Sequence, residues 1–139
     1  MLVVLCPGQG SQTPGFLQPW LELDSFASVV SSLSEASGID IAKHGIESDA
    51  DTIRDTAVAQ PLIVAASIAS ALELGSGFNA VAGHSVGEFA AAALAGILTP
   101  EEAIRAVSVR SRAMAAAAAL EPTSMAAVLG GEQSVVLER

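Results

Sequence analysis

One serine stands between two glycines in the segment Gly83-His84-Ser85-Val86-Gly87. The apolar residues before it predict a buried strand over residues 79–83, and the alanine-rich run after it predicts a helix over residues 87–95. A serine on a sharp turn between a strand and a helix is held out at the carboxyl end of the strand, where its hydroxyl can attack an acyl group. The alternative is that Ser85 only caps the helix, which is a common role for serine.

A serine nucleophile needs donors for the developing oxyanion and a base for its proton. The N–H group of Val86, at the start of the predicted helix, would point toward that oxyanion. His84 neighbours the serine on a tight turn, where its ring cannot easily reach the hydroxyl, so we expect it to be a packed turn residue rather than the base. His44 lies in a charged segment and is expected at the surface.

Arg110 follows on a helix whose start is marked by Thr99 as the N-cap, Pro100 in the first turn and Glu102 completing a capping box. A guanidinium group binds a carboxylate with two parallel hydrogen bonds and keeps its charge, so Arg110 could bind an anionic substrate. If its spacing of 25 positions from Ser85 is left aside, Arg110 could equally be a plain surface arginine. Arg105 and Arg112 lie at other angles on the same helix and are expected in solvent.

Strands that alternate with helices predict an α/β fold with a mostly parallel sheet. Between residues 39 and 56 we expect short turns and one-turn helices, with Asp49, Asp51 and Asp55 on a solvated face and no metal site, because no rigid ligand spacing appears. The other expected elements are strands over residues 2–5 and 124–131, and helices over 25–37 with Asp24 as N-cap, over 61–74 opened by Pro61, over 100–120, and from 132.

The charge of the chain narrows the classes of partner. Six basic residues against 15 acidic ones give a net charge of −9, which argues against binding to nucleic acids and anionic membranes.

The lone Cys6 cannot form an internal disulfide, which fits a reducing cytoplasm. Residues 1–6 are too short for a signal peptide, and residues 61–74 are too short to span a bilayer. We therefore expect a cytoplasmic protein.

Four motifs follow one another along the chain: PGQGSQ at residues 7–12, AQP at 59–61, GHSVGE at 83–88 and VRSRAM at 109–114. Together they resemble the malonyl-CoA:acyl carrier protein transacylases and, more broadly, the acyltransferase domains of fatty-acid and polyketide synthases. The resemblance covers residues 2–131. It implies a hydrolase-like α/β core with a nucleophile elbow, into which a ferredoxin-like subdomain is inserted. Residues 1–122 would belong to the core, and residues 123–139 would begin the insert.

The resemblance also implies the chemistry. Ser85 would accept the malonyl group from malonyl-CoA as an ester and pass it to the phosphopantetheine thiol of acyl carrier protein, without a further cofactor or a metal. The backbone N–H groups of Val86 and Gln9 would form the oxyanion hole, and Gln9 would line the substrate site. Arg110 would bind the malonyl carboxylate. The aliphatic Val86 after the serine, together with AQP, favours malonyl over methylmalonyl.

The catalytic histidine of that family lies in a later segment that these 139 residues do not include. The sequence thus resembles the amino-terminal part of such an enzyme, and we expect the chain alone to be nearly inactive, because a serine without a base is a poor nucleophile. Two alternatives stay open. One is a serine hydrolase of the esterase type, which would leave Arg110 without a role, and the other is a non-catalytic, truncated module.

Overall fold

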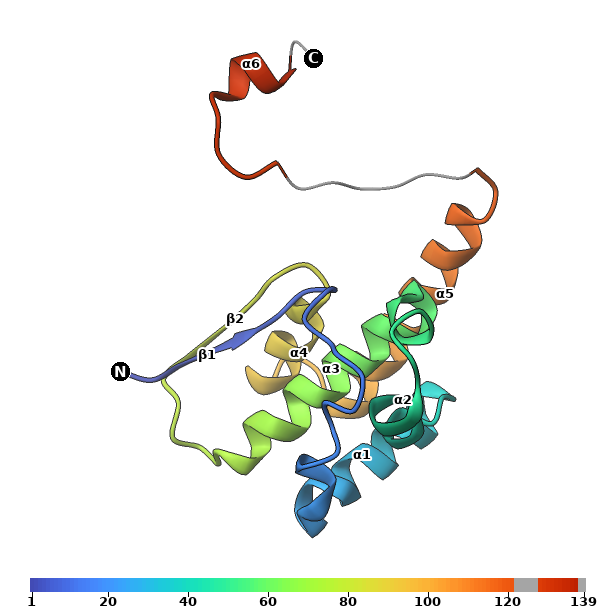
Figure 1. Ribbon diagram of the computed structural model, residues 1–139. Helices are drawn as coiled ribbons and strands as arrows, with labels where there is room; N and C mark the ends of the chain where they lie inside the picture. Colours follow the sequence, from blue (N-terminus) through green and yellow to red (C-terminus); the bar gives the residue numbers. More distant parts are fainter. Residues whose placement is uncertain (122–127, 138–139) are drawn as a thin grey trace.

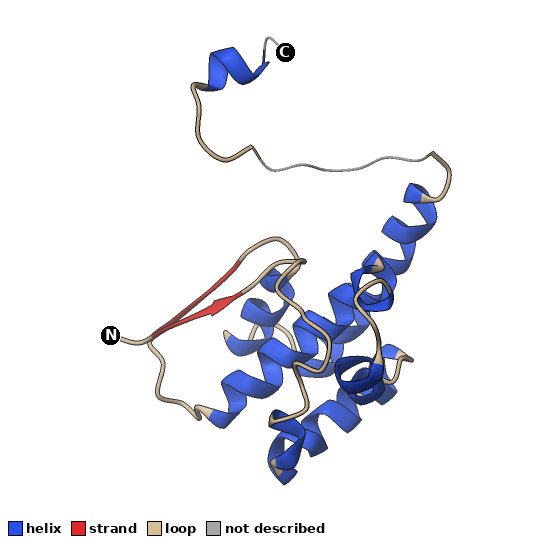
Figure 2. Cartoon of the chain, viewed as in Figure 1, coloured by secondary structure: helices blue, strands red, loops and turns tan. Residues whose placement is uncertain are grey.

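The computed structural model describes residues 1–121 and 128–137, in which helices pack against a two-stranded sheet (Figures 1 and 2). Among the described residues the fold is α/β, mostly helical, with a small parallel sheet. Its elements are β1 (Val3–Cys6), the 3-10 helix η1 (Trp20–Glu22), α1 (Asp24–Ser37), α2 (Ile41–Glu47), the 3-10 helix η2 (Thr52–Arg54), α3 (Thr56–Glu73), β2 (Ala80–Gly83), α4 (Gly87–Leu94), α5 (Pro100–Ala118) and α6 (Gln133–Leu137).

The two strands that the sequence predicts near the amino terminus and before Ser85 are confirmed as β1 and β2. They pair in parallel, with Val3 opposite Ala80 and Cys6 opposite Gly83. The strand expected over residues 124–131 is wrong for residues 128–131, which form no strand, while 124–127 lie outside the described residues. An apolar run forms a strand only where a neighbouring strand offers backbone partners, and none lies beside residues 128–131 in the described part of the chain.

Helix α3 is the core helix, and it begins earlier than expected. The Asp55 carboxylate accepts a hydrogen bond from the Ala57 N–H (2.7 Å), so the helix starts at Thr56 and Pro61 lies inside it. Proline lacks the N–H that would bond the Ala57 carbonyl, and the Ser111 hydroxyl of α5 donates to this carbonyl instead (3.5 Å). By length and composition α3 could cross a membrane, but 56% of it is buried inside the fold, as in a core helix.

The ends of α1 and the start of α5 are determined by residues next to them in the sequence. Gly38, with φ of 76°, ends α1 as the sequence predicts, because only a residue tolerant of the left-handed conformation fits there. At the other end the N-cap is Leu23 and not Asp24, which lies in the first turn and makes no capping hydrogen bond. The capping box of α5 is confirmed: Thr99 accepts from the Glu102 N–H (3.1 Å) and Glu102 accepts from the Thr99 N–H (2.7 Å).

The segment between α1 and α3 forms the short helices α2 and η2, as the sequence predicts. At the other end of the chain, α6 confirms the helix expected after residue 132, and it stands apart from the other helices in Figure 1. The apolar core lies between α1, α3, α4, α5 and the inner face of the sheet, and alanine lines much of it. Small side chains let these helices approach closely, which fixes the positions of the residues at their ends.

Replacing Glu102 with alanine should lower the stability of the protein at neutral pH. Hydrogen bonds from Thr99 hold the pKa of the Glu102 carboxyl below its ordinary value. A lowered pKa means that the stabilisation is full above the unfolded-state pKa and disappears as the pH falls through the folded-state pKa. The difference in unfolding free energy between wild type and Glu102→Ala should therefore shrink in acid, measured by urea denaturation at several pH values. A difference that stays the same from neutral to acidic pH would contradict this role of the Glu102 carboxylate.

Candidate active site

Ser85 lies on the turn between β2 and α4 and has a left-handed backbone conformation, with φ of 53°. It is the one non-glycine residue with positive φ in the described part of the chain. This conformation is strained for a residue with a side chain, and such strain is kept where the surrounding structure enforces it. Ser85 is also exposed, so its hydroxyl is presented to solvent at the carboxyl end of β2.

The glycines on either side of Ser85 explain how the turn can be so sharp. A Cβ atom on Gly87 would collide with the backbone of Cys6 and would lie 2.6 Å from the Pro7 carbonyl oxygen. A Cβ atom on Gly83 would collide with the backbone at the start of α4. Both positions therefore require glycine, and the first turn of α4 rests directly on the end of β1.

The loop after β1 lies against the same turn. The His84 N–H donates to the Cys6 carbonyl (3.0 Å), and a Cβ on Gly8 would lie 2.6 Å from Nδ1 of His84. Within the described residues, the backbone N–H groups of Gln9 and Val86 donate to no protein acceptor. Two unpaired N–H groups near an exposed hydroxyl, one of them at a helix start, can bind a negatively charged oxygen.

A cavity of about 540 Å³ brings the predicted residues together. Ser85, Gln9 and Arg110 all line it, although they lie on three different parts of the chain. Val86 is buried (1% exposed), so only its backbone can take part. The complete lining comprises Gln9, Gly10, Gln12, Pro14, Ala50, Ile53, Arg54, Thr56, Gln60, His84, Ser85, Arg110 and Met114.

Arg110 is held by a buried amide. Its Nη1 donates to Oε1 of Gln60, a residue of α3 that is only 2% exposed. The Gln60 amide in turn donates to Oε1 of Gln9 (3.4 Å) and contacts the sulfur of Met114 (3.5 Å). A series of side-chain hydrogen bonds thus links Arg110 of α5 through Gln60 to the loop after β1. The guanidinium keeps further N–H groups that can bind a ligand.

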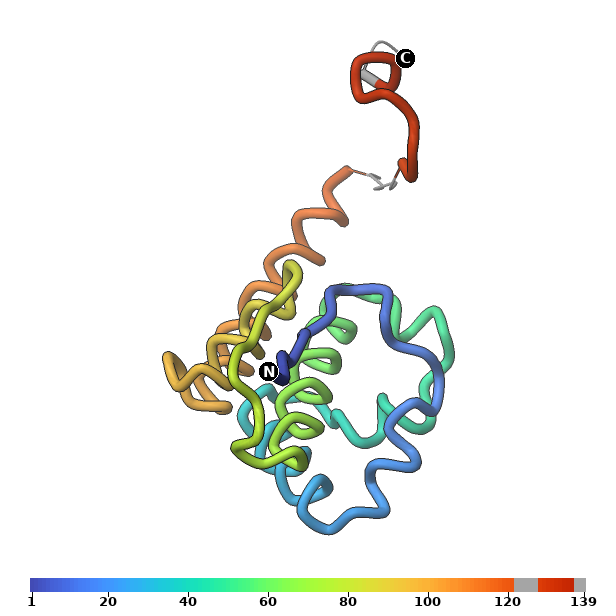
Figure 3. Tube along the Cα trace, turned by 90° about the vertical axis from the view of Figure 1, so that its left-hand side faces the viewer, coloured from blue at the N-terminus to red at the C-terminus, as the bar shows by residue number. Residues whose placement is uncertain are grey.

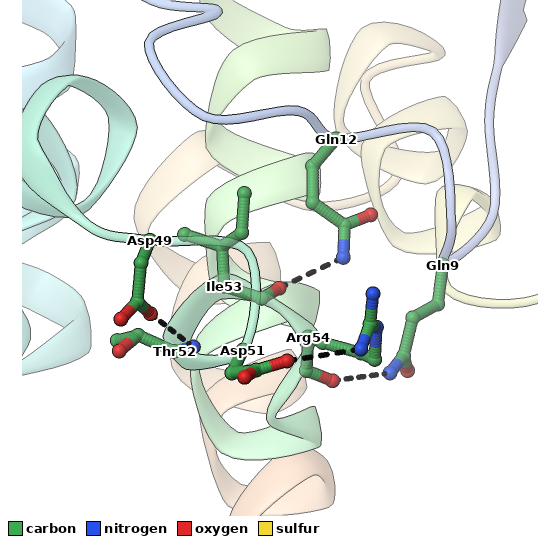
Figure 4. A network of polar contacts seen from close by, with 7 residues as sticks. All are labelled: Gln9, Gln12, Asp49, Asp51, Thr52, Ile53 and Arg54. Atoms are coloured by element: carbon green, nitrogen blue, oxygen red, sulfur yellow. Dashed lines mark hydrogen bonds and ion pairs between the residues drawn. The ribbon is translucent and has the colours of Figure 1, made fainter.

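A second set of contacts fixes the loop from the other side (Figure 4). The Gln9 amide donates to the Arg54 carbonyl (3.2 Å), and the Gln12 amide donates to the Ile53 carbonyl (2.8 Å). Both acceptors belong to η2, so this 3-10 helix anchors the loop at the rim of the cavity. The neighbouring Arg54–Asp51 ion pair (3.0 Å) is largely exposed and adds little stability.

Two of the aspartates before α3, Asp49 and Asp55, accept hydrogen bonds from backbone N–H groups. Asp49 accepts from the Thr52 N–H (2.8 Å), and these hydrogen bonds lower the pKa of its carboxyl. Asp49, Asp51 and Asp55 are exposed, as expected; Asp49 bonds to the first residue of η2, and Asp55 caps the long helix α3. No cluster of three His, Cys, Asp or Glu side chains that could hold a metal occurs within residues 1–121 and 128–137.

Neither histidine is hydrogen-bonded to the Ser85 hydroxyl in the described part of the chain. His84 lines the cavity beside Gly8, but it is exposed, so the expectation of a packed turn residue is wrong. His44 is half-buried rather than fully at the surface, because it lies in α2 with its Nδ1 2.9 Å from the Ser48 hydroxyl. Arg105 and Arg112 are exposed, as predicted.

Sequence reasoning gave no structural role to Gln60, Met114, Gln12 and Arg54, which all line the cavity. Gln60 could have been identified from the sequence, because a single amide inside a mostly apolar helix must find hydrogen-bond partners when it is buried. Met114 lies one helical turn after Arg110, so the two side chains share a face of α5. The other two depend on how the loop after β1 folds back on η2, which no local pattern predicts.

Residues 3–136 match the family described as acyl transferase domain, and this match covers nearly the whole chain. The chain belongs to the acyl transferase domain family. The malonyl CoA-acyl carrier protein transacylase of Mycobacterium tuberculosis (strain H37Rv) is 47% identical over 145 residues, which cover 100% of this chain and 48% of that protein.

Solved structures agree with the family assignment. The crystal structure of MCAT from Mycobacterium tuberculosis superimposes with a TM-score of 0.92 at 46% identity, over 99% of this chain and 48% of that one. A malonyl-transacylase in complex with its type II polyketide acyl-carrier protein gives a TM-score of 0.75 at 30% identity, over 84% of this chain and 39% of that one. The chain spans about half the length of the acyl transferases that it matches.

Replacing Gly87 with alanine should destabilise this acyl transferase fold by about 1–3 kcal/mol, because the new methyl group must push α4 away from the end of β1. Thermal or urea unfolding measures the loss. Gly77→Ala is the matched control, since its Cβ would meet only the Leu74 carbonyl at 3.7 Å and its φ is not positive. Equal stabilities of the two variants would show that the close contact at Gly87 is not a constraint.

Proposed function

We propose that this chain carries the serine, the oxyanion donors and the carboxylate-binding arginine of a malonyl-CoA:acyl carrier protein transacylase. The observation that carries the proposal is the single cavity that Ser85 and Arg110 line together. An exposed hydroxyl and a fixed cation in one cavity suit an acyl group that bears a free carboxylate. The names of the relatives, which include malonyl transacylases from several organisms, support the same substrate.

In the proposed reaction the Ser85 oxygen attacks the thioester carbonyl of malonyl-CoA. The carbon–sulfur bond breaks, coenzyme A leaves as its thiol, and the malonyl group stays on Ser85 as an ester. The phosphopantetheine thiol of acyl carrier protein then attacks the ester carbonyl, and the bond from the carbonyl carbon to the Ser85 oxygen breaks. The malonyl group is left on the carrier as a thioester, and the thiol proton passes to Ser85. The reaction needs no cofactor beyond the thioester itself.

The turn at Ser85 is the proposed nucleophile elbow. Its positive φ and the flanking glycines support this assignment, because the elbow must hold the serine out on a strained turn. The unpaired N–H groups of Gln9 and Val86 would bind the oxyanion of the tetrahedral intermediate. Because the Gln9 side chain is bonded to η2, its backbone is fixed before substrate arrives.

Arg110 would bind the malonyl carboxylate, and Gln60 would set the orientation of the guanidinium. The hydrogen bond to Gln60 uses one N–H of Arg110 and leaves the others for a bidentate contact. An esterase that acts on neutral esters would gain nothing from this cation, so Arg110 favours the transacylase over the esterase alternative.

We place residues 1–122 in the hydrolase-like core, and residues 123–139 at the beginning of a ferredoxin-like insert.

Mass spectrometry of the chain after incubation with malonyl-CoA tests the proposal. Because neither histidine is hydrogen-bonded to the Ser85 hydroxyl in the described part of the chain, we expect slow ester formation that added imidazole accelerates, with the malonyl group on Ser85 and none on a Ser85→Ala variant. A modification spread over several serines, or one unaffected by Ser85→Ala, would contradict the role of Ser85.

The preference for malonyl-CoA over acetyl-CoA tests Arg110. Since a hydrogen bond to a charged group contributes about 1.5–3 kcal/mol, Arg110→Ala should lower malonyl loading at least about tenfold and leave acetyl loading nearly unchanged. Arg112→Ala, an exposed arginine of the same helix, is the matched control and should keep the preference. Loss of the preference in both variants, or in neither, would remove the proposed role of Arg110.

A further inference from the structure

The loop after β1 holds the backbone around Gln9 from both sides. Figure 3 shows this loop (blue) bending away from β1 toward the segment that contains η2. The Ser11 hydroxyl donates to the Gly8 carbonyl (3.1 Å), and the Gly10 N–H donates to Oε1 of Gln12 (2.9 Å). The first bond is made by the peptide unit before Gln9 and the second by the peptide unit after it. Both planes that meet at Gln9 are therefore held, which restricts its φ and ψ angles.

The hydrogen bond from Ser11 acts on the peptide unit that carries the Gln9 N–H. The Gly8 carbonyl and the Gln9 N–H belong to one planar trans unit, in which the two groups point in opposite directions. A donor that fixes the carbonyl therefore also fixes the direction of the N–H. The hydroxyl strengthens this donor as well, because hydrogen bonds along a chain of polar groups polarise one another.

Ser11 makes its hydrogen bond within the loop itself. The side chains of Gln9 and Gln12 bond to carbonyls of η2, whereas the one hydrogen bond of the Ser11 hydroxyl within the described residues goes to Gly8. Ser11 is exposed, so water could replace the carbonyl as its partner and the bond adds little to stability. The alternative is that Ser11 only supports the turn, as serines often do when they bond to a nearby carbonyl.

We infer that Ser11 is a positioning residue for the oxyanion hole. Its hydroxyl directs the Gln9 N–H toward the oxygen that becomes negative when Ser85 attacks a thioester. The inference rests on the proposed function and deepens it, since it names the side chain that sets one of the two backbone donors. An oxyanion donor binds the transition state more strongly than the ground state, so a misdirected N–H lowers the rate of acyl transfer and leaves the affinity for the substrate unchanged.

The rate at which malonyl-CoA loads Ser85, measured with added imidazole over a range of malonyl-CoA concentrations, tests this role. Ser11→Ala should lower the maximal rate about tenfold, which is part of the roughly 100-fold or larger loss caused by removing a whole oxyanion donor. The half-saturating concentration should not change. Ser11→Thr keeps a hydroxyl and should load within about twofold of the unchanged chain. Ser76→Ala, an exposed serine after α3, is the matched control and should load like the unchanged chain.

The final malonylated fraction separates slow chemistry from poor folding, because it counts the chains that can react at all. It should be the same for Ser11→Ala and the unchanged chain. A smaller fraction that reacts at the unchanged rate would show that Ser11 supports only the fold, and would overturn the inference. Equal losses in Ser11→Ala and Ser11→Thr, or a change in the half-saturating concentration alone, would overturn it too.

Failure of this inference and failure of the proposed function give different results. If the unchanged chain is not loaded on Ser85, the proposed function fails and the role of Ser11 fails with it. If the unchanged chain is loaded on Ser85 and Ser11→Ala is loaded equally fast, only the role of Ser11 fails.

Discussion

The contact between Gly87 and the carbonyl groups at the end of β1 is the constraint on which the site depends. It brings the first turn of α4 against the strand, and this leaves Ser85 no room except on a strained turn at the surface. The same contact places the loop after β1 beside the turn, where the His84 N–H bonds to the Cys6 carbonyl. One missing methyl group thus sets the position of both the hydroxyl and the backbone donors.

The second determinant is a pair of adjacent residues in the core helix. Gln60 places a buried amide where it can bridge Arg110 and Gln9, while Pro61 frees the Ala57 carbonyl for the hydroxyl of Ser111. The other buried residues of α3 are apolar, and many of them are alanine. Beside the cavity, buried hydrogen bonds between α3 and α5 hold the cation in one orientation.

Features governed by neighbouring residues could be predicted from the sequence. The turn at Ser85, the capping box at Thr99 and the end of α1 at Gly38 each follow from a few adjacent side chains. The start of α3 could not be predicted from Pro61, because the Asp55 cap outweighs the missing proline N–H and the freed carbonyl finds a partner on α5. The same limit applies to Gln60, since only tertiary packing decides which residues a buried amide meets.

The left-handed conformation of Ser85 sets stability against activity at one position. Glycine adopts φ of 53° without strain, so the backbone at this turn would be more relaxed without the serine side chain. A selection for thermal stability alone would thus favour glycine at position 85, and it would remove the hydroxyl of the proposed nucleophile. The proposed role of Ser85 as the nucleophile would explain why this turn keeps a strained serine instead of a relaxed glycine.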